Sequence, residues 1–206
     1  MLNVFARVHT DRLTEPVARW LVARGVAPDA VTVMGTLGTV AAAVWFLPRG
    51  ELFAATVVIT FFVLLDLVDG AMARARGRST AFGAVLDSTG DRLADGALFA
   101  ALAWWALGAG DQRLVGVAAL VCLVAGQLVS YVKARAEGAG LSADGGLVER
   151  AERLIIALVG TGLEGLGVPY ALAVALWLLA AASVWTFGQR VLQVHRSAAA
   201  QDPGPR

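Results

Sequence analysis

The sequence predicts an all-α integral membrane protein. Of its residues 58% are hydrophobic and 16% are charged, and the mean hydropathy is +0.68, which leaves too few polar groups to cover a compact soluble particle. The apolar residues form runs close to the roughly 20 residues that a helix needs to cross a bilayer. The runs lack the apolar and polar alternation of barrel strands, and an open sheet would leave backbone groups unpaired in lipid. Helices are therefore the spanning structure that fits.

The same composition excludes two other classes of protein. A formal net charge of +1 does not suit a strongly basic nucleic-acid-binding protein, so we expect no nucleic-acid partner. The single cysteine, Cys122, lies in an apolar run and cannot form the disulfide framework of a small secreted domain.

Six apolar stretches predict six transmembrane helices, at residues 31–48, 52–75, 82–108, 113–137, 149–166 and 169–194. With these spans, Arg49 and Arg113 fall in loops on one side of the membrane and Arg92 lies inside the third span. The remaining Lys and Arg residues fall at or near the opposite side. The positive-inside rule therefore places both termini in the cytosol and predicts a multi-pass protein of the cell membrane.

The two ends of the chain carry their own patterns. Residues 2–24 interleave arginines with apolar residues at helical spacing, which predicts an amphipathic helix along the inner membrane interface and not a signal peptide. Residues 197–206 are rich in Ala, Pro and Gly and predict a disordered tail. No internal repeat marks a second domain, so we expect residues 1–206 to form a single membrane domain.

Aspartates lie where a membrane span should be apolar. Asp66 and Asp69 stand near the end of the second span, and Asp87 and Asp91 near the start of the third. An intramembrane charge costs about 2.5–3.5 kcal/mol at a helix centre, which makes such acids functional candidates. Each pair shares a helix face because its members are three or four residues apart. A short linker makes the two helices antiparallel neighbours, so we expect the four carboxylates to meet near the cytosolic end.

Four gathered carboxylates need cations to offset their repulsion. Mg²⁺ prefers carboxylates together with substrate phosphates, and two divalent ions can clamp a diphosphate. Gly70 leaves room for close backbone approach, and Arg74, one turn further on, can bind a phosphate oxygen. The residues thus suit attack by an alcohol on a diphosphate, with Asp91 accepting the proton. Asp95 by itself is more simply a polar packing residue or a partner of Arg92.

The segment Asp66-x2-Asp69-Gly70-x2-Ala73-Arg74-x8-Gly83-x3-Asp87-x3-Asp91 resembles the signature of the CDP-alcohol phosphotransferase family. The resemblance implies a six-span enzyme of phospholipid biosynthesis that joins a CDP-linked lipid or alcohol to a second alcohol. It implies two divalent ions, Mg²⁺ or Mn²⁺, and a general base. The implied metal ligands are Asp66, Asp69, Asp87 and Asp91, with Asp91 also the base.

The resemblance extends to the contacts with the CDP-lipid. Pro28-Asp29-x-x-Thr32 is similar to the family's Pro-Asn-x-x-Thr, with Asp in place of Asn. The same residues equally fit a helix start with Asp29 as its N-cap. The implied CDP-lipid contacts are Asp29, Thr32, Gly70, Arg74 and Thr80.

Cations outside the signature point to a phosphate on the acceptor. Lys133 and Arg135 end the fourth span, Arg150 and Arg153 begin the fifth, and Arg190 lies in the sixth. The positive-inside rule by itself also predicts cations at these helix ends. If the cations of the three helices instead converge in one pocket, that pocket would suit a phosphate. Stretches 82–87, 130–137 and 144–155 resemble the branch of the family that joins CDP-diacylglycerol to an inositol phosphate as a homodimer. The resemblance implies that Lys133, Arg153 and Arg190 bind the phosphate of the acceptor.

Three alternatives remain open at the level of sequence. Within the family, glycerol 3-phosphate is a phosphorylated acceptor that would use similar cations. A divalent-cation transporter also places acids in spans, although such acids are expected along a path near the bilayer midplane. A structural membrane scaffold would need none of the aspartates for an activity.

Overall fold

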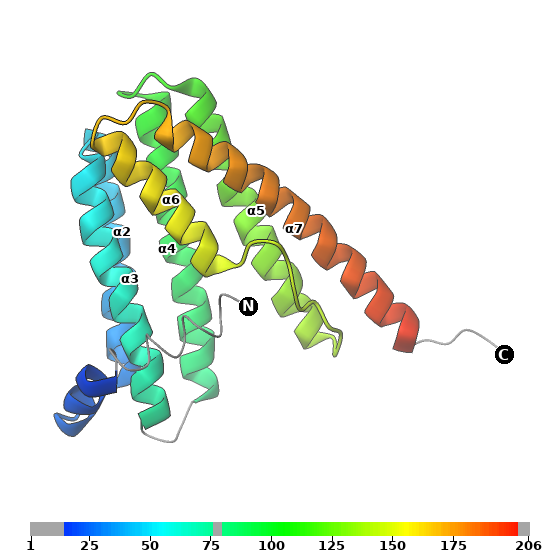
Figure 1. Ribbon diagram of the computed structural model, residues 1–206. Helices are drawn as coiled ribbons and strands as arrows, with labels where there is room; N and C mark the ends of the chain where they lie inside the picture. Colours follow the sequence, from blue (N-terminus) through cyan, green and yellow to red (C-terminus); the bar gives the residue numbers. More distant parts are fainter. Residues whose placement is uncertain (1–14, 76–79, 202–206) are drawn as a thin grey trace. The chain divides into compact units, whose positions relative to one another are not determined.

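The protein is described by a computed structural model that covers residues 15–75 and 80–201. Throughout this part of the chain the regular structure is helical (Figure 1). The elements are α2 (Pro28–Phe46), the 3₁₀ turn η1 (Leu47–Arg49), α3 (Leu52–Ala75), α4 (Ala81–Leu107), α5 (Arg113–Gly138), α6 (Arg150–Gly165) and α7 (Ala171–Gln201). Each expected span coincides with one of these helices to within a few residues, apart from a longer α7. The prediction of an all-α fold is confirmed.

Local chemistry sets where several helices begin and end. Pro28 opens α2, a position that does not need its missing N–H. Pro48 lies in η1, and Gly50 follows with φ of 76°, a left-handed conformation that glycine adopts at little cost. A reciprocal capping box between Glu149 and Glu152 starts α6. These signals separate the helices at the loops that the sequence predicts.

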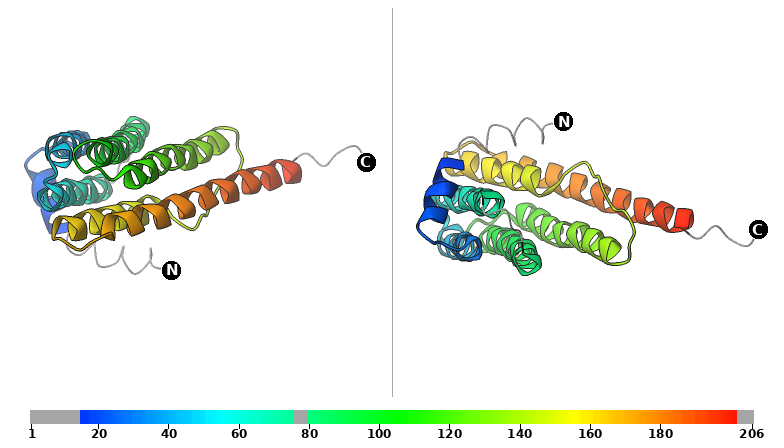
Figure 2. Two further views of the ribbon diagram at one scale, coloured as in Figure 1. Left: turned by 90° about the horizontal axis from the view of Figure 1, so that it is seen from above. Right: turned by 90° about the horizontal axis from the view of Figure 1, so that it is seen from below.

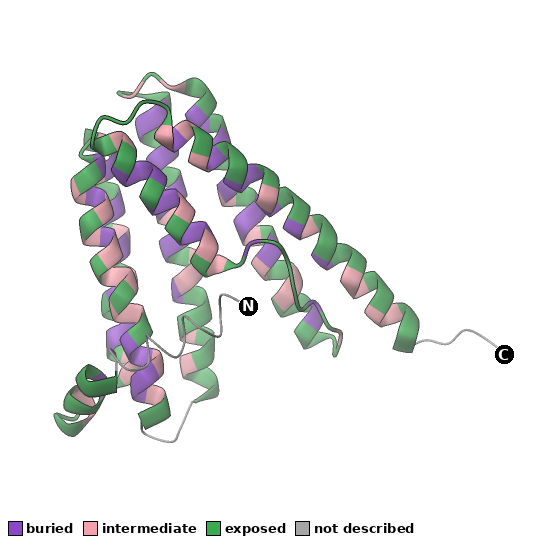
Figure 3. Ribbon diagram, viewed as in Figure 1, coloured by how far each residue is buried: buried purple, intermediate pink, exposed green. Residues whose placement is uncertain are grey.

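Within residues 15–75 and 80–201, four helical segments are long and apolar enough to cross a membrane: Pro28–Arg49, Leu52–Ala75, Arg113–Gly138 and Ala171–Gln201. Helix α4 has 27 residues but carries Asp87, Asp91, Arg92 and Asp95, and α6 has 16 residues, fewer than a full crossing needs. Large apolar residues such as Trp104, Leu114 and Leu178 are exposed, as lipid contact requires. Exposed residues occur along the helices (Figure 3). The chain is a multi-pass membrane protein.

The chain divides into two compact units. The first contains Met1–Trp45 and Val57–Leu98. One core cluster in this unit joins Ala18, from the helix over residues 15–23, to Val31 of α2 and to Val68, Ala71 and Met72 of α3. This core fixes the end of α3 that carries Asp66 and Asp69.

Two glycines let α2 pack closely in the first unit. A Cβ on Gly35 of α2 would lie 3.3 Å from the carbonyl oxygen of Phe62 in α3. A Cβ on Gly90 of α4 would lie 2.5 Å from Oγ1 of Thr36 in α2. Small residues at such crossings are typical of membrane helices, whose association depends on close packing.

The second unit contains Phe46–Thr56 and Phe99–Arg206. Helices α5 and α7 run side by side, and α6 packs against α7 (Figures 1 and 2). Glu164 of α6 links three elements, since one carboxylate oxygen accepts from Gln112 Nε2 at 3.2 Å and the other from the backbone N–H of Leu172 at 3.1 Å. The second bond satisfies an N–H in the first turn of α7.

The ends of the chain differ partly from the sequence-based expectation. Residues 197–201, predicted to be disordered, continue α7 as helix, because the run Ala198–Ala200 favours helix and two side chains bind the α5–α6 loop. The Ser197 hydroxyl accepts from Ser142 N at 3.1 Å, and Gln201 Nε2 donates to Gly140 O at 2.9 Å. Residues 202–206 of the predicted tail, and residues 2–14 of the predicted amphipathic helix, lie outside the described residues.

Candidate active site

Three of the four predicted carboxylates lie together in the first unit. Asp66 and Asp69 come from the last turns of α3, and Asp87 from the second turn of α4. Each offers an oxygen within 4.8 Å of the other two. Asp69 is buried, Asp66 is partly buried and Asp87 is exposed. The group of carboxylates is therefore buried at Asp69 and reaches the protein surface at Asp87. Clustered carboxylate oxygens are the hard ligands that Mg²⁺ and Mn²⁺ take, and the group therefore fits a divalent metal ion.

Thr32 supports the buried member of this group. Its hydroxyl donates a hydrogen bond to Oδ2 of Asp69 across the contact between α2 and α3, and it also lies 3.3 Å from Pro28 O. Asp69 is 7% exposed, so this bond orients a carboxylate that few water molecules reach. A hydrogen bond of this kind fixes which oxygen faces a metal.

Asp91 is not part of the group of three. It follows Asp87 by one helical turn, about 5–6 Å along α4, and its Oδ2 lies 3.5 Å from Nη2 of Arg92. The sequence predicts the shared helix face of Asp87 and Asp91, but the reach of each side chain depends on packing. Asp91 thus stands beside the carboxylate group, one turn deeper in the helix.

The predicted nucleotide contacts surround the same helix ends. A Cβ on Gly83 would lie 2.9 Å from Thr80 Oγ1 and 3.1 Å from Asp29 Oδ1, so these two side chains converge where α4 begins. Thr80 Oγ1 accepts from Gly83 N at 2.9 Å and caps α4. In α3, the Arg74 guanidinium lies over Gly70, with Nη1 3.5 Å from the place of a Cβ. A side chain on Gly70 would take that space.

An apolar groove opens next to these contacts in the first unit. It begins at Asp29 and is lined by Val33, Met34, Leu37, Gly38, Phe62, Phe82 and Leu86. Polar contacts and an apolar surface therefore adjoin each other at Asp29, an arrangement that suits an amphiphilic ligand.

The three predicted acceptor cations lie along one face of α5 in the second unit. A Cβ on Gly126 would lie 2.2 Å from Nη1 of Arg153, so this α6 side chain rests directly on the α5 backbone. Arg190 of α7 donates from Nη1 to Val129 O at 2.8 Å. Lys133 projects from α5 itself. Positions 126, 129 and 133 are successive turns, so the cations span about 10 Å of the helix.

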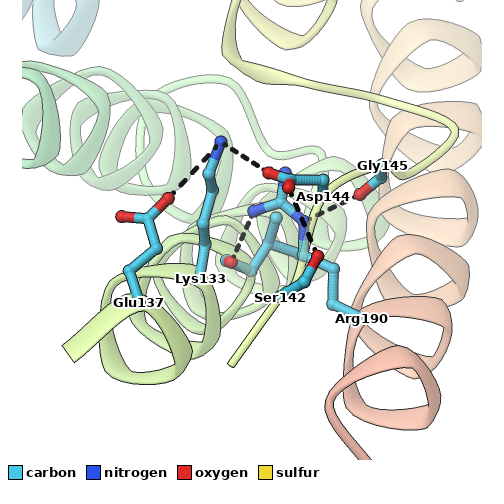
Figure 4. Close-up of polar contacts among 7 residues, drawn as sticks. Lys133, Glu137, Ser142, Asp144, Gly145 and Arg190 are labelled. Atoms are coloured by element: carbon cyan, nitrogen blue, oxygen red, sulfur yellow. Dashed lines mark hydrogen bonds and ion pairs between the residues drawn. The ribbon is translucent and has the colours of Figure 1, made fainter. Parts of the chain in front are cut away.

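The loop between α5 and α6, residues 139–149, closes over two of these cations (Figure 4). Arg190 Nε donates to Gly145 O at 3.0 Å. Lys133 Nζ lies 3.8 Å from Asp144 Oδ1 and 3.9 Å from Glu137 Oε1. Arg190 and Arg153 are 5% and 3% exposed, so this is a buried cationic strip with Lys133 at its open end.

Sequence reasoning missed the residues that position these groups. Gly35, Gly90 and Gly126 lie inside the predicted spans, and none of them is a residue that the signature specifies. The contact of Thr32 with Asp69 joins residues 37 positions apart. Glycine within an apolar run is the one signal that could have indicated close packing.

Comparison with known proteins identifies the family. The sequence profile described as CDP-alcohol phosphatidyltransferase matches residues 25–188. The chain belongs to this family. The match to the CDP-alcohol phosphatidyltransferase family spans the carboxylate group together with Lys133 and Arg153, and ends two residues before Arg190. The resemblance seen in the sequence is thereby confirmed.

Members of the CDP-alcohol phosphatidyltransferase family match over almost the whole chain. A phosphatidylinositol phosphate synthase of Mycobacterium marinum is 52% identical over 200 residues, 96% of this chain and 86% of that protein. A crystal structure of the Mycobacterium tuberculosis phosphatidylinositol phosphate synthase with CDP-DAG bound has 50% identity and a TM-score of 0.88, covering 95% of this chain and 100% of that one. The same synthase in complex with manganese and citrate has 50% identity, a TM-score of 0.87 and 93% coverage of both chains.

Proposed function

We propose that this protein transfers the phosphatidyl group from CDP-diacylglycerol to the hydroxyl of an inositol phosphate, giving phosphatidylinositol phosphate and CMP. The observation that carries the proposal is the match along almost the entire chain to a phosphatidylinositol phosphate synthase crystallised with CDP-DAG. The group of Asp66, Asp69 and Asp87 supports the same chemistry, because metal-bound carboxylates suit a diphosphate substrate.

The proposed metal ligands are Asp66, Asp69, Asp87 and Asp91, which would hold two divalent ions, Mg²⁺ or Mn²⁺. A relative crystallised with manganese supports a divalent ion. Bound ions would neutralise the diphosphate and the departing phosphate. Thr32 holds Asp69 in position for this role.

The proposed reaction is direct attack without a covalent enzyme intermediate. The acceptor oxygen forms a bond to the phosphorus that carries the diacylglycerol, the bond from that phosphorus to the bridging oxygen breaks, and CMP leaves with this oxygen. Asp91 takes the proton of the attacking hydroxyl. Its place one turn beyond Asp87 puts this fourth proposed ligand next to the three carboxylates that lie within 4.8 Å of one another.

The CDP-lipid is assigned to the residues that surround the ends of α3 and α4. Arg74, lying across Gly70, is placed to contact a phosphate oxygen. Thr80 and Asp29 converge at Gly83 and are assigned to the nucleotide together with Thr32. The apolar groove that starts at Asp29 gives the acyl part of the same ligand a surface without polar groups.

The acceptor's phosphate is assigned to Lys133, Arg153 and Arg190. Their alignment along α5 supports this role, because it gathers two buried guanidinium groups and one ammonium group, all of which can donate hydrogen bonds to phosphate. Arg190 also holds the loop through Gly145. A phosphate on the acceptor gains charge-assisted hydrogen bonds from such a strip.

The membrane arrangement completes the proposal. In this proposal the six helices α2 to α7 form one membrane domain, residues 1–206, with both termini and the site on the cytosolic side. The residues that flank α6 complete its crossing, as the span predicted at 149–166 requires. The N-terminal helix lies along the interface, where Trp20, 53% exposed and stacked on Arg24 at 3.9 Å, acts as an anchor. The protein works as a homodimer.

The test is release of CMP by the purified protein with CDP-diacylglycerol, Mg²⁺ and one phosphorylated alcohol at a time. Inositol phosphate should support turnover and glycerol 3-phosphate should not. If glycerol 3-phosphate supports turnover and inositol phosphate does not, the acceptor of this protein is glycerol 3-phosphate. Metal uptake into proteoliposomes without CMP release would point to a transporter.

A further inference from the structure

Lys133 differs from the other two cations of the strip in its partners. Its ammonium group is paired with two carboxylates, Glu137 on the next turn of α5 and Asp144 from the α5–α6 loop. The Glu137 pair runs from Lys to Glu, the less favourable direction on a helix. Asp144 lies eleven residues after Lys133 in the chain, and the fold of the α5–α6 loop places it next to Lys133.

The loop holds the backbone of Asp144 in place from both sides. Ser142 N donates to Ser197 Oγ at 3.1 Å, and Arg190 Nε donates to Gly145 O at 3.0 Å. Ala143, between them, is 1% exposed. Gly145 and Gly146 have φ of 104° and 147°, a backbone that an L side chain rarely adopts. The position of the Asp144 backbone is thus fixed by α7.

The carboxylate of Asp144 is by contrast easy to displace. Its side chain is 77% exposed and that of Lys133 41% exposed, with 3.8 Å between the charged atoms. Ser142 Oγ is its other contact, donating to Oδ2 at 3.3 Å. Exposed ion pairs at such distances are weak, whereas a phosphate brings nearly two negative charges and several strong acceptors.

We propose that Asp144 is an internal competitor for the acceptor's phosphate. When no acceptor is bound, the loop places this carboxylate on Lys133, and the phosphate must displace it in order to bind. The competition lowers the affinity of the strip for every phosphate anion, so that weakly bound anions such as inorganic phosphate are kept out. This inference rests on the proposed role of Lys133 in acceptor binding.

The test compares the full-length protein with its Asp144→Asn variant, which keeps the shape and removes the charge. We expect the KM for inositol phosphate and the inhibition constant of inorganic phosphate both to fall by about threefold, within the range of an exposed ion pair. The kcat and the KM for CDP-diacylglycerol should stay unchanged. Asp111→Asn, at the other end of α5, removes one charge from an exposed loop and should change none of these values.

A double-mutant cycle tests whether Asp144 acts through Lys133. In a Lys133→Ala background, Asp144→Asn should make no further difference to phosphate inhibition. An unchanged or higher KM for Asp144→Asn in the presence of Lys133 would overturn the proposal and would assign Asp144 to the loop's structure or to direct contact with the acceptor.

A binding measurement separates this inference from the proposed function. The rise in melting temperature with inorganic phosphate requires no turnover. Its midpoint should occur at about threefold lower phosphate in Asp144→Asn than in the wild type. If the wild type releases no CMP with inositol phosphate, the proposed function fails while this shift still decides the role of Asp144, and equal midpoints would reject it.

Discussion

A single hydroxyl decides how the most buried carboxylate of the site is presented. Asp69 has two other carboxylates within 4.8 Å, and their repulsion would turn it away unless a donor held it. Thr32, reaching over from α2, is that donor. Thr32, which is proposed to contact the nucleotide, therefore also orients a proposed metal ligand.

Thr32→Val should weaken metal binding without unfolding the protein. The substitution keeps the branched shape and removes the donor to Asp69, and loss of such a supporting bond costs about 10–100-fold in metal affinity. The measurement is the Mg²⁺ concentration that gives half-maximal CMP release. Thr32→Ser, which retains the hydroxyl, should restore the wild-type value, and failure to do so would assign the effect to packing.

Asp91→Asn tests the separation of Asp91 from the group of three. Because Asp91 stands outside that group, its amide should abolish the proton transfer and reduce kcat by about 10²–10⁴-fold. The midpoint of the melting-temperature rise with Mg²⁺ and CDP-diacylglycerol should move little. A variant that loses the Mg²⁺ effect altogether would make Asp91 primarily a metal ligand.

At the scale of helices, glycines determine how closely neighbouring helices and side chains can approach. Gly35 and Gly90 bring α2 close to its neighbours, and Gly126 lets Arg153 rest on α5. A cation that lies against a backbone has little freedom to change rotamer. Close helix contacts thus convert flexible side chains into fixed parts of a site.

Gly126→Ala should impair acceptor binding selectively. The new Cβ would lie 2.2 Å from Arg153 Nη1, so the guanidinium must move away from its place on the strip. We expect the KM for inositol phosphate to rise about tenfold, the cost of a weakened charge-assisted hydrogen bond, with the KM for CDP-diacylglycerol unchanged.

Gly138→Ala is the matched control on the same helix. Nothing lies within 4 Å of a Cβ there, and alanine also favours helix. A similar rise in KM for both variants would indicate a general effect on α5 and would contradict the role given to Arg153.

At the scale of the whole molecule, the membrane determines which surfaces are exposed. Outward-facing side chains include Trp104, Leu114 and Tyr170, each more than 70% exposed, which would favour aggregation in water. The charged residues of α4 all lie between Asp87 and Asp95, and the rest of the helix up to Leu107 carries none. This asymmetry keeps α4 compatible with a crossing while its first turns carry the site.

Labelling of single cysteines should reveal the predicted topology. In a Cys122→Ala background, Ser142→Cys in the α5–α6 loop and Ala109→Cys in the α4–α5 loop are both exposed positions. A membrane-impermeant thiol reagent should label position 109 in intact cells and position 142 only in inverted vesicles, because the positive residues lie at the latter end. Labelling of both positions from one side would contradict a crossing by α5.

The sequence alone determined the helical membrane fold, the limits of most helices and the reaction family. Hydropathy and helical periodicity are local properties, and the spacing from Asp66 to Asp91 lies within one helix pair. One expectation was wrong in part, since α7 continues as helix through Gln201. The four metal ligands stay a prediction, and three of them lie within 4.8 Å of one another.

The tertiary structure decided which distant side chains meet. The contacts of Thr32 with Asp69, Arg153 with Gly126 and Lys133 with Asp144 join different helices or a helix and a loop. Such contacts depend on how closely the helices pack and on which rotamers remain open, and neither is encoded in a local pattern. The chemistry of the site is therefore readable along the chain, whereas the orientation of its groups and the competition at Lys133 arise from packing.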